Sequence, residues 1–124
     1  MNKDISSRAD LLQLVSNFYE KLLADDSINY LFTDIAKINL DHHIPVLVDF
    51  WDSIIFQSDT YQKNAMQPHI NLHQKSPLQP QHFETWLRYF NETVDELFEG
   101  EKAFLAKERA LSIATVMKIK LIQQ

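Results

Sequence analysis

The sequence of 124 residues contains no cysteine, one glycine, four prolines and no long apolar run. Without cysteine it can form neither a disulfide nor a thiolate metal site. One glycine is too few for a glycine-rich phosphate loop, and the scarcity of turn residues argues against a sandwich or barrel of strands. No stretch has the length and hydrophobicity of a membrane span or a signal-peptide core. These absences favour a mostly helical chain.

Basic residues are also scarce, with 12 Lys and Arg against 17 Asp and Glu, which gives a net charge of −5. This balance argues against a nucleic-acid surface and provides no basic patch for a membrane. Apolar residues make up 45% and charged residues 23%, as in ordinary globular domains. We therefore expect a single domain over residues 1–124, located in the cytoplasm, without nucleic-acid or membrane partners.

Apolar residues recur at helical spacing near both ends of the chain. Leu11, Val15, Phe18 and Leu22 predict a helix over about 8–24. A short helical turn is expected to end at Phe32. Two further helices are predicted over about 80–99, with Pro80 in the first turn and Gly100 as the stop, and over about 101–121.

The middle of the chain is less regular. A helix is predicted over about 41–57, and because a proline inside a helix lacks a backbone donor, Pro45 predicts either a start near His42 or a kink. Residues 58–80 hold three of the four prolines and show no sustained helical period. This pattern predicts a long irregular segment, which in a small domain is typical of a binding loop.

The histidines are the main candidates for chemistry, since the chain has no His-Glu-x-x-His, Glu-x-x-His or nucleophile-elbow motif. His43 lies on the apolar face of its predicted helix and reads locally as a core histidine, whereas His42 and His82 are expected to be exposed. His69 and His73, four residues apart, would share one helix face. They could hold zinc, although no third ligand is evident, or one of them could bind a cofactor iron as a neutral imidazole.

Four motifs in order change the interpretation of these residues. They are Phe18-Tyr19-Glu20-Lys21, His43 seven residues before Phe50-Trp51, Met66-Gln67-Pro68-His69-Ile70-Asn71-Leu72, and His82-Phe83-Glu84-Thr85-Trp86-Leu87. Together they resemble the group III truncated haemoglobins, and the resemblance covers about residues 8–121. It implies an all-α, shortened globin fold, a two-over-two helical sandwich around haem b.

The resemblance also implies roles for individual residues. His69 would be the proximal iron ligand, with His73 as the alternative because His73-Gln74-Lys75 lengthens the following loop. Tyr19, His43 and Trp86 would line the distal side. The porphyrin would contact Phe32, Leu47, Phe50, Trp51, Phe83, Trp86 and Phe90, and its propionates would meet Lys63, Lys75 or Arg88.

Such a protein would bind O2, NO and CO at a five-coordinate iron. Because Tyr19 and Trp86 would both donate hydrogen bonds to bound O2, we expect slow release, and hence redox chemistry or detoxification rather than bulk transport. Peroxidase-like or NO-oxidising activity would need an external reductase. Two alternatives remain at this stage: a helical interaction module without a cofactor, and a metal site built on His69 and His73.

Overall fold

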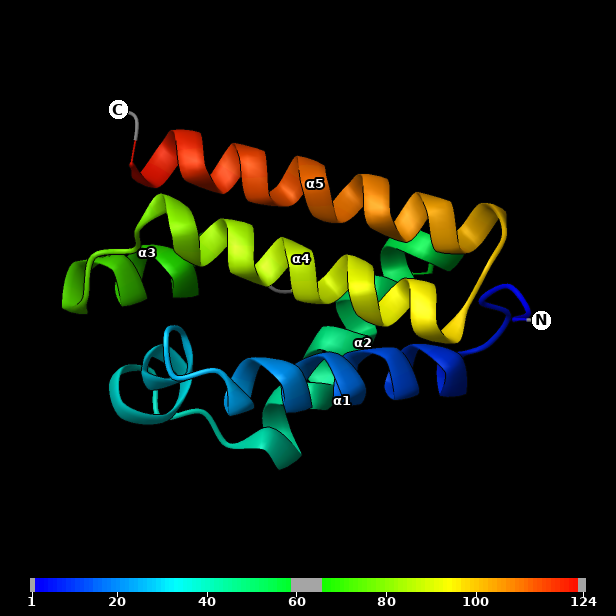
Figure 1. The fold of residues 1–124 in the computed structure, drawn as a ribbon, viewed down its shortest axis with the longest axis horizontal. Coiled ribbons are helices and arrows are strands. Elements are labelled where there is room, and N and C mark those ends of the chain that lie inside the picture. Colours follow the sequence, from blue (N-terminus) through cyan, green and yellow to red (C-terminus); the bar gives the residue numbers. More distant parts are fainter. Residues whose placement is uncertain (1, 59–65, 123–124) are drawn as a thin grey trace.

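The computed structural model describes residues 2–58 and 66–122, and all regular elements in these two stretches are helical. In chain order they are α1 (Arg8–Ala24), the short π-helix η1 (Leu31–Ile35), α2 (Leu40–Phe56), α3 (Met66–Lys75), α4 (Pro80–Leu97) and α5 (Glu101–Leu121). Helices α4 and α5 run side by side along the length of the molecule, and α1 and α2 pack against them (Figure 1). This is the expected two-over-two arrangement. Within the described stretches no helix is both long and apolar enough to cross a bilayer.

The predicted apolar face of α1 forms the centre of the core. Ser7 caps the helix by accepting a hydrogen bond from the backbone N–H of Asp10, which satisfies one of the free donors of the first turn. Leu11 and Leu22 are fully buried and Phe18 is nearly so, as their spacing predicts. The predicted helix over 101–121 is confirmed as well, with Ala106 and Ala110 fully buried against the core.

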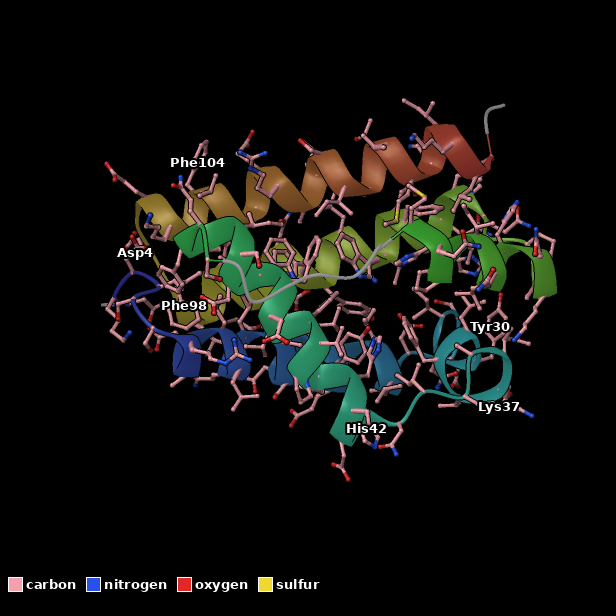
Figure 2. All side chains as sticks on the ribbon, turned by 180° about the vertical axis from the view of Figure 1, so that it is seen from behind. Asp4, Tyr30, Lys37, His42, Phe98 and Phe104 are labelled. Carbon is pink, nitrogen blue, oxygen red and sulfur yellow. The ribbon has the colours of Figure 1, made fainter. Side chains whose placement is uncertain are left out.

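The N-terminal segment fastens the corner between α4 and α5, at the end of the molecule where Figure 2 labels Asp4 and Phe98. The carboxylate of Asp4 accepts hydrogen bonds from the backbone N–H groups of Lys102 and Ala103 in the first turn of α5. Gly100 has φ +144°, and a Cβ there would lie 2.5 Å from Asp4 Cγ. The prediction that Gly100 ends the helix over 80–99 is wrong. Helix α4 ends at Leu97, and Gly100 is the N-cap residue of α5.

Of the two expectations for α2, the start near His42 is two residues too late, and a kink at Pro45 stays a prediction. Asn39 caps the helix by accepting from the backbone N–H of Asp41, so α2 begins at Leu40 and continues through Pro45. The stabilisation by this cap, together with the buried Val48, Trp51 and Ile55 further along, outweighs the loss of one backbone hydrogen bond at the proline.

The largest correction concerns residues 58–80, which were expected to be irregular. Residues 66–75 form α3, while 59–65 lie outside the described residues. Pro68 is the third residue of α3, in the first turn, where backbone N–H groups have no partner within the helix. The helical period was hard to recognise in the sequence because no residue of α3 is fully buried and two of its five half-buried side chains are histidines.

Candidate functional site

A large cavity lies between the helices, with a volume of about 620 Å³, within the range of roughly 300–1,000 Å³ typical of cofactor sites. Its lining is mostly apolar, and all six helices contribute to it. Nine of the predicted site residues line it: Tyr19, Phe32, His43, Leu47, Phe50, Trp51, His69, Phe83 and Trp86. The structure therefore brings together residues that lie far apart in the sequence.

Phe90, the remaining predicted contact, lies behind this lining. It is fully buried, and its ring is stacked on Trp51 at 4.8 Å and on Trp86 at 5.8 Å between centroids. The ring of Phe18 meets it edge-on at 5.3 Å. Phe90 thus supports two tryptophans that face the cavity without lining it itself.

Tyr19 on α1 and His43 on α2 form a polar pair at the cavity. The Oη atom of Tyr19 lies 2.8 Å from Nε2 of His43. Tyr19 is only 5% exposed, and burial raises the pKa of its hydroxyl above the usual range. Burial also lowers the pKa of His43, and the charge on His69 lowers it further. At neutral pH both side chains are therefore uncharged.

His69 and His73 lie on α3 but have different surroundings. His69 lines the same cavity as His43. The Nδ1 atom of His73 instead accepts a hydrogen bond of 2.9 Å from the backbone N–H of Leu78. Within residues 2–58 and 66–122, no three His, Asp or Glu side chains are grouped closely enough to hold a metal ion.

His82 was expected to be exposed, but it is 7% exposed and lines the cavity. Its Nδ1 atom accepts from the backbone N–H of Gln79, and its Nε2 atom lies 3.0 Å from Oη of Tyr30. Burial lowers the pKa of this imidazole. The correction has a local cause: histidine replaces the Glu or Gln that usually signals such a cap in the first helical turn.

Polar residues at the cavity include one of the three basic residues considered for the propionates. Lys75 lines the cavity together with Asn71, and both are exposed to solvent. Arg88 is directed elsewhere, since its guanidinium lies 4.8 Å from the centre of the Tyr89 ring and 4.0 Å from Asp25. Lys63 lies outside the described residues.

Residues 3–121 match the family model described as bacterial-like globin. The chain belongs to the bacterial-like globin family. The group 3 truncated hemoglobin ctb of Campylobacter jejuni is 22% identical to this globin over 118 residues, which are 93% of this chain and 91% of the relative. The crystal structure of group III truncated hemoglobin from Campylobacter jejuni matches its fold with a TM-score of 0.85 at 21% identity, covering 98% of this chain and 95% of that one.

Membership in the globin family implies a haem that binds diatomic ligands. The cavity of this globin fits that group chemically. Its apolar walls suit a porphyrin, its lining includes imidazoles, the side-chain type that binds haem iron, and Lys75 and Asn71 are polar groups of the kind that pair with carboxylates.

Sequence reasoning missed several lining residues of this globin. Ile113 and Met117 of α5 were predicted to face inward but were not associated with the cavity, and Leu78 was assigned no role. Helical periodicity marks an inward face without separating side chains that pack on protein from those that line a cavity. Only the fold shows that distinction.

Proposed function

We propose that this globin binds haem b with His69 as the protein ligand of the iron, and that Tyr19, His43 and Trp86 surround the diatomic ligand. One observation carries the proposal: a single apolar cavity receives His69 from α3 and the hydrogen-bonded Tyr19–His43 pair from α1 and α2. When bound, haem supplies an iron with an open position for O2, NO or CO.

The Tyr19–His43 pair can present one hydrogen to a ligand. If His43 carries its hydrogen on Nε2, it donates to Oη of Tyr19 and leaves the tyrosine hydroxyl free to donate into the cavity. In the other tautomer the hydroxyl donates to His43 and is not available. A ligand that gains negative charge accepts hydrogen bonds strongly, so it favours the first tautomer. His43 then orients Tyr19.

Trp86 provides a second donor. Its indole lines the cavity, and the near-parallel stack on Phe90 holds the ring in place. In the part of the chain that the structure describes, no group accepts a hydrogen bond from this indole, so its N–H is available to a ligand.

Two donors in an apolar cavity favour slow ligand release. A buried hydrogen bond to a charged acceptor contributes about 1.5–3 kcal/mol, which corresponds to a roughly 10- to 150-fold slower escape. Slow release suits redox chemistry or detoxification of O2 and NO better than bulk O2 transport. Repeated turnover of this kind requires electrons, so we include an external reductase as a partner in the proposal.

The haem assignment is tested with absorption spectra of the wild type, His69→Ala and His73→Ala after addition of hemin, then dithionite and CO. We expect a sharp Soret band that shifts with CO in the wild type and in His73→Ala, and its loss in His69→Ala. Absence of the band in the wild type would overturn the proposal. Loss in His73→Ala with retention in His69→Ala would move the ligand to His73.

The role of Tyr19 is tested by stopped-flow measurement of O2 dissociation. We expect Tyr19→Phe to release O2 about 10- to 150-fold faster, since it loses one hydrogen bond to the ligand. Tyr89→Phe is the matched control, because its hydroxyl donates to Asp25 and does not line the cavity. Equal rates in Tyr19→Phe and the wild type would rule out this donor.

A further inference from the structure

We propose that His73 and His82 clamp the connection between α3 and α4 and thereby set the orientation of His69. The inference rests on the proposed role of His69 as the iron ligand. Both histidines would act as positioning residues, because neither is assigned a contact with the iron.

The clamp consists of two imidazoles on consecutive peptide groups. The backbone N–H of Leu78 donates to Nδ1 of His73, and that of Gln79 donates to Nδ1 of His82, each at 2.9 Å. His73 belongs to the last turn of α3 and His82 to the first turn of α4. Side chains from both helices therefore hold the same short connection, whereas an ordinary cap would serve one helix only.

Packing alone holds α3 weakly, which gives the clamp its importance. Most helices are stabilised by a buried apolar face, but α3 has no fully buried residue and packs on the core only through half-buried side chains such as Leu72. The chain next becomes buried at Leu78, which is 6% exposed and lines the cavity. The clamp therefore attaches the C-terminal end of α3 to Leu78, the next buried residue along the chain.

His69 precedes His73 by one helical turn, so the two side chains share one face of α3. A rotation or shift of α3 that breaks the bond from Leu78 to His73 therefore also displaces the imidazole of His69. Through this shared face, the clamp fixes the direction from which His69 approaches the iron.

The hydrogen-bond directions assign the tautomer of each imidazole. A nitrogen that accepts from a backbone N–H carries no hydrogen, so in a neutral ring the hydrogen is on Nε2. In His82 this Nε2–H donates to Oη of Tyr30, which ties the clamp to the segment before η1. The atom that matters for the clamp is thus Nδ1 in both histidines.

This assignment allows a specific test by substitution. The side-chain oxygen of asparagine takes nearly the place of Nδ1, whereas that of glutamine reaches toward Nε2. Each histidine is replaced in turn by Ala, Asn and Gln in the haem-loaded protein. Gln74→Ala and Gln81→Ala are the matched controls, since each removes an exposed polar side chain next to one clamp residue.

Three measurements report whether the two hydrogen bonds of the clamp are formed and how they affect His69 and haem binding. The iron–histidine stretching band in resonance Raman spectra of the ferrous protein reports the orientation of His69. Transfer of haem to excess apomyoglobin gives the rate of haem loss, and hydrogen exchange of the Leu78 and Gln79 amides reports the clamp itself.

We expect both Ala variants to shift or broaden the band and to lose haem about tenfold faster, the effect of one lost hydrogen bond. The Asn variants should restore both properties and the Gln variants should not, while the controls match the wild type. An unchanged band in the Ala variants, or rescue by Gln equal to that by Asn, would overturn the proposal. If an Ala variant does not fold, the comparison of the Asn and Gln variants still tests the proposal. It is supported if the Asn variant keeps the wild-type band and rate of haem loss while the Gln variant does not, and overturned if the two variants behave alike.

Failure of the proposed function can be distinguished from failure of the clamp. If the wild type takes up no haem, the proposal that His69 binds the iron is refuted. The clamp would still predict slow exchange of the Leu78 and Gln79 amides in the wild type and fast exchange in the Ala variants. Fast exchange of both amides in the wild type would refute the clamp directly.

Discussion

The two helices that the clamp connects differ in what holds them in place. Helix α4 contains Phe90, Thr93 and Val94, all with 0% exposure, and its far end is joined to α5 at a corner that Asp4 fastens. Helix α3 buries no residue. In Figure 2 the labels Asp4 and Phe98 mark the end of the molecule with the α4–α5 corner, and Tyr30 and Lys37 lie toward the other end. The helix that carries the proposed iron ligand is therefore held less by buried side chains than α4 is.

Truncation of two aromatic side chains of α4, one in the core and one at the cavity wall, measures how much stability a fully buried side chain provides. We expect Phe90→Ala to lower the free energy of unfolding by about 3–5 kcal/mol, because it removes a fully buried ring between two tryptophans. Phe83→Ala, at the half-buried cavity wall, should cost clearly less. Urea unfolding measures both.

Phe104→Ala is the control for this pair. Its ring is 62% exposed on α5, so its removal should change stability by no more than about 0.5 kcal/mol. A cost for Phe83→Ala equal to that for Phe90→Ala would contradict the contrast between cavity wall and core.

Removal of haem should affect α3 far more than α4. Because α3 has no buried face of its own, we expect its amides to exchange about 100-fold faster in the haem-free protein, equivalent to roughly 2.7 kcal/mol of lost stabilisation by the bound group. The amides around Phe90 and Val94 should change little. Hydrogen exchange with and without haem measures this, and uniform acceleration across both helices would argue against the contrast.

The same contrast explains how much of the fold could be predicted from the sequence. Helices with a buried face, α1 and α5, were predicted closely because burial imposes a 3.6-residue period on apolar positions. Helix α3 was missed because its inward side chains are only half-buried and include the polar His69 and His73. The start of α2 was placed two residues too late because the Asn39 cap was overlooked and Pro45 was given too much weight.

The candidate site shows a similar limit. Short motifs brought Tyr19, His43 and His69 to attention, and the fold places all three at one cavity. The burial of His82 and its bond to Gln79 could not be predicted, since they depend on how the loop folds back on α4. Local sequence contains the residue types, but only the tertiary structure determines which nitrogen of an imidazole meets which peptide group.

At the corner between α4 and α5, loss of the Asp4 carboxylate should lower the free energy of unfolding moderately. Burial alone would raise the pKa of Asp4, but hydrogen bonds from the backbone N–H groups of Lys102, Ala103 and Ile5 outweigh it and lower the pKa. We expect Asp4→Ala to reduce stability by about 1–2 kcal/mol, as for the loss of a helix cap. Glu20→Ala, which removes an exposed carboxylate from α1, should change it by less than about 0.5 kcal/mol.

The smallest predicted effect concerns pH and the connection after α1. Asp25 accepts hydrogen bonds from the Ser27 side chain and from the hydroxyl of Tyr89 on α4, and these bonds lower its pKa to about 2. The unfolded chain would have the ordinary value of 3.8. Since the folded pKa is the lower one, the stabilisation from Asp25 is fully present above about pH 4 and is lost as the pH falls toward 2.

Replacement of Asp25 by Asn should therefore make the free energy of unfolding less dependent on pH in the acid range. The free energy of unfolding should decrease less between pH 5 and pH 2 in Asp25→Asn than in the wild type, because the unfolded state no longer takes up a proton at this residue. Asp26→Asn, at the exposed neighbouring position, should keep a slope closer to that of the wild type. Equal slopes in Asp25→Asn and the wild type would mean that the hydrogen bonds from Ser27 and Tyr89 do not stabilise the Asp25 carboxylate in solution, so that this contact does not help to hold α4 to the end of α1.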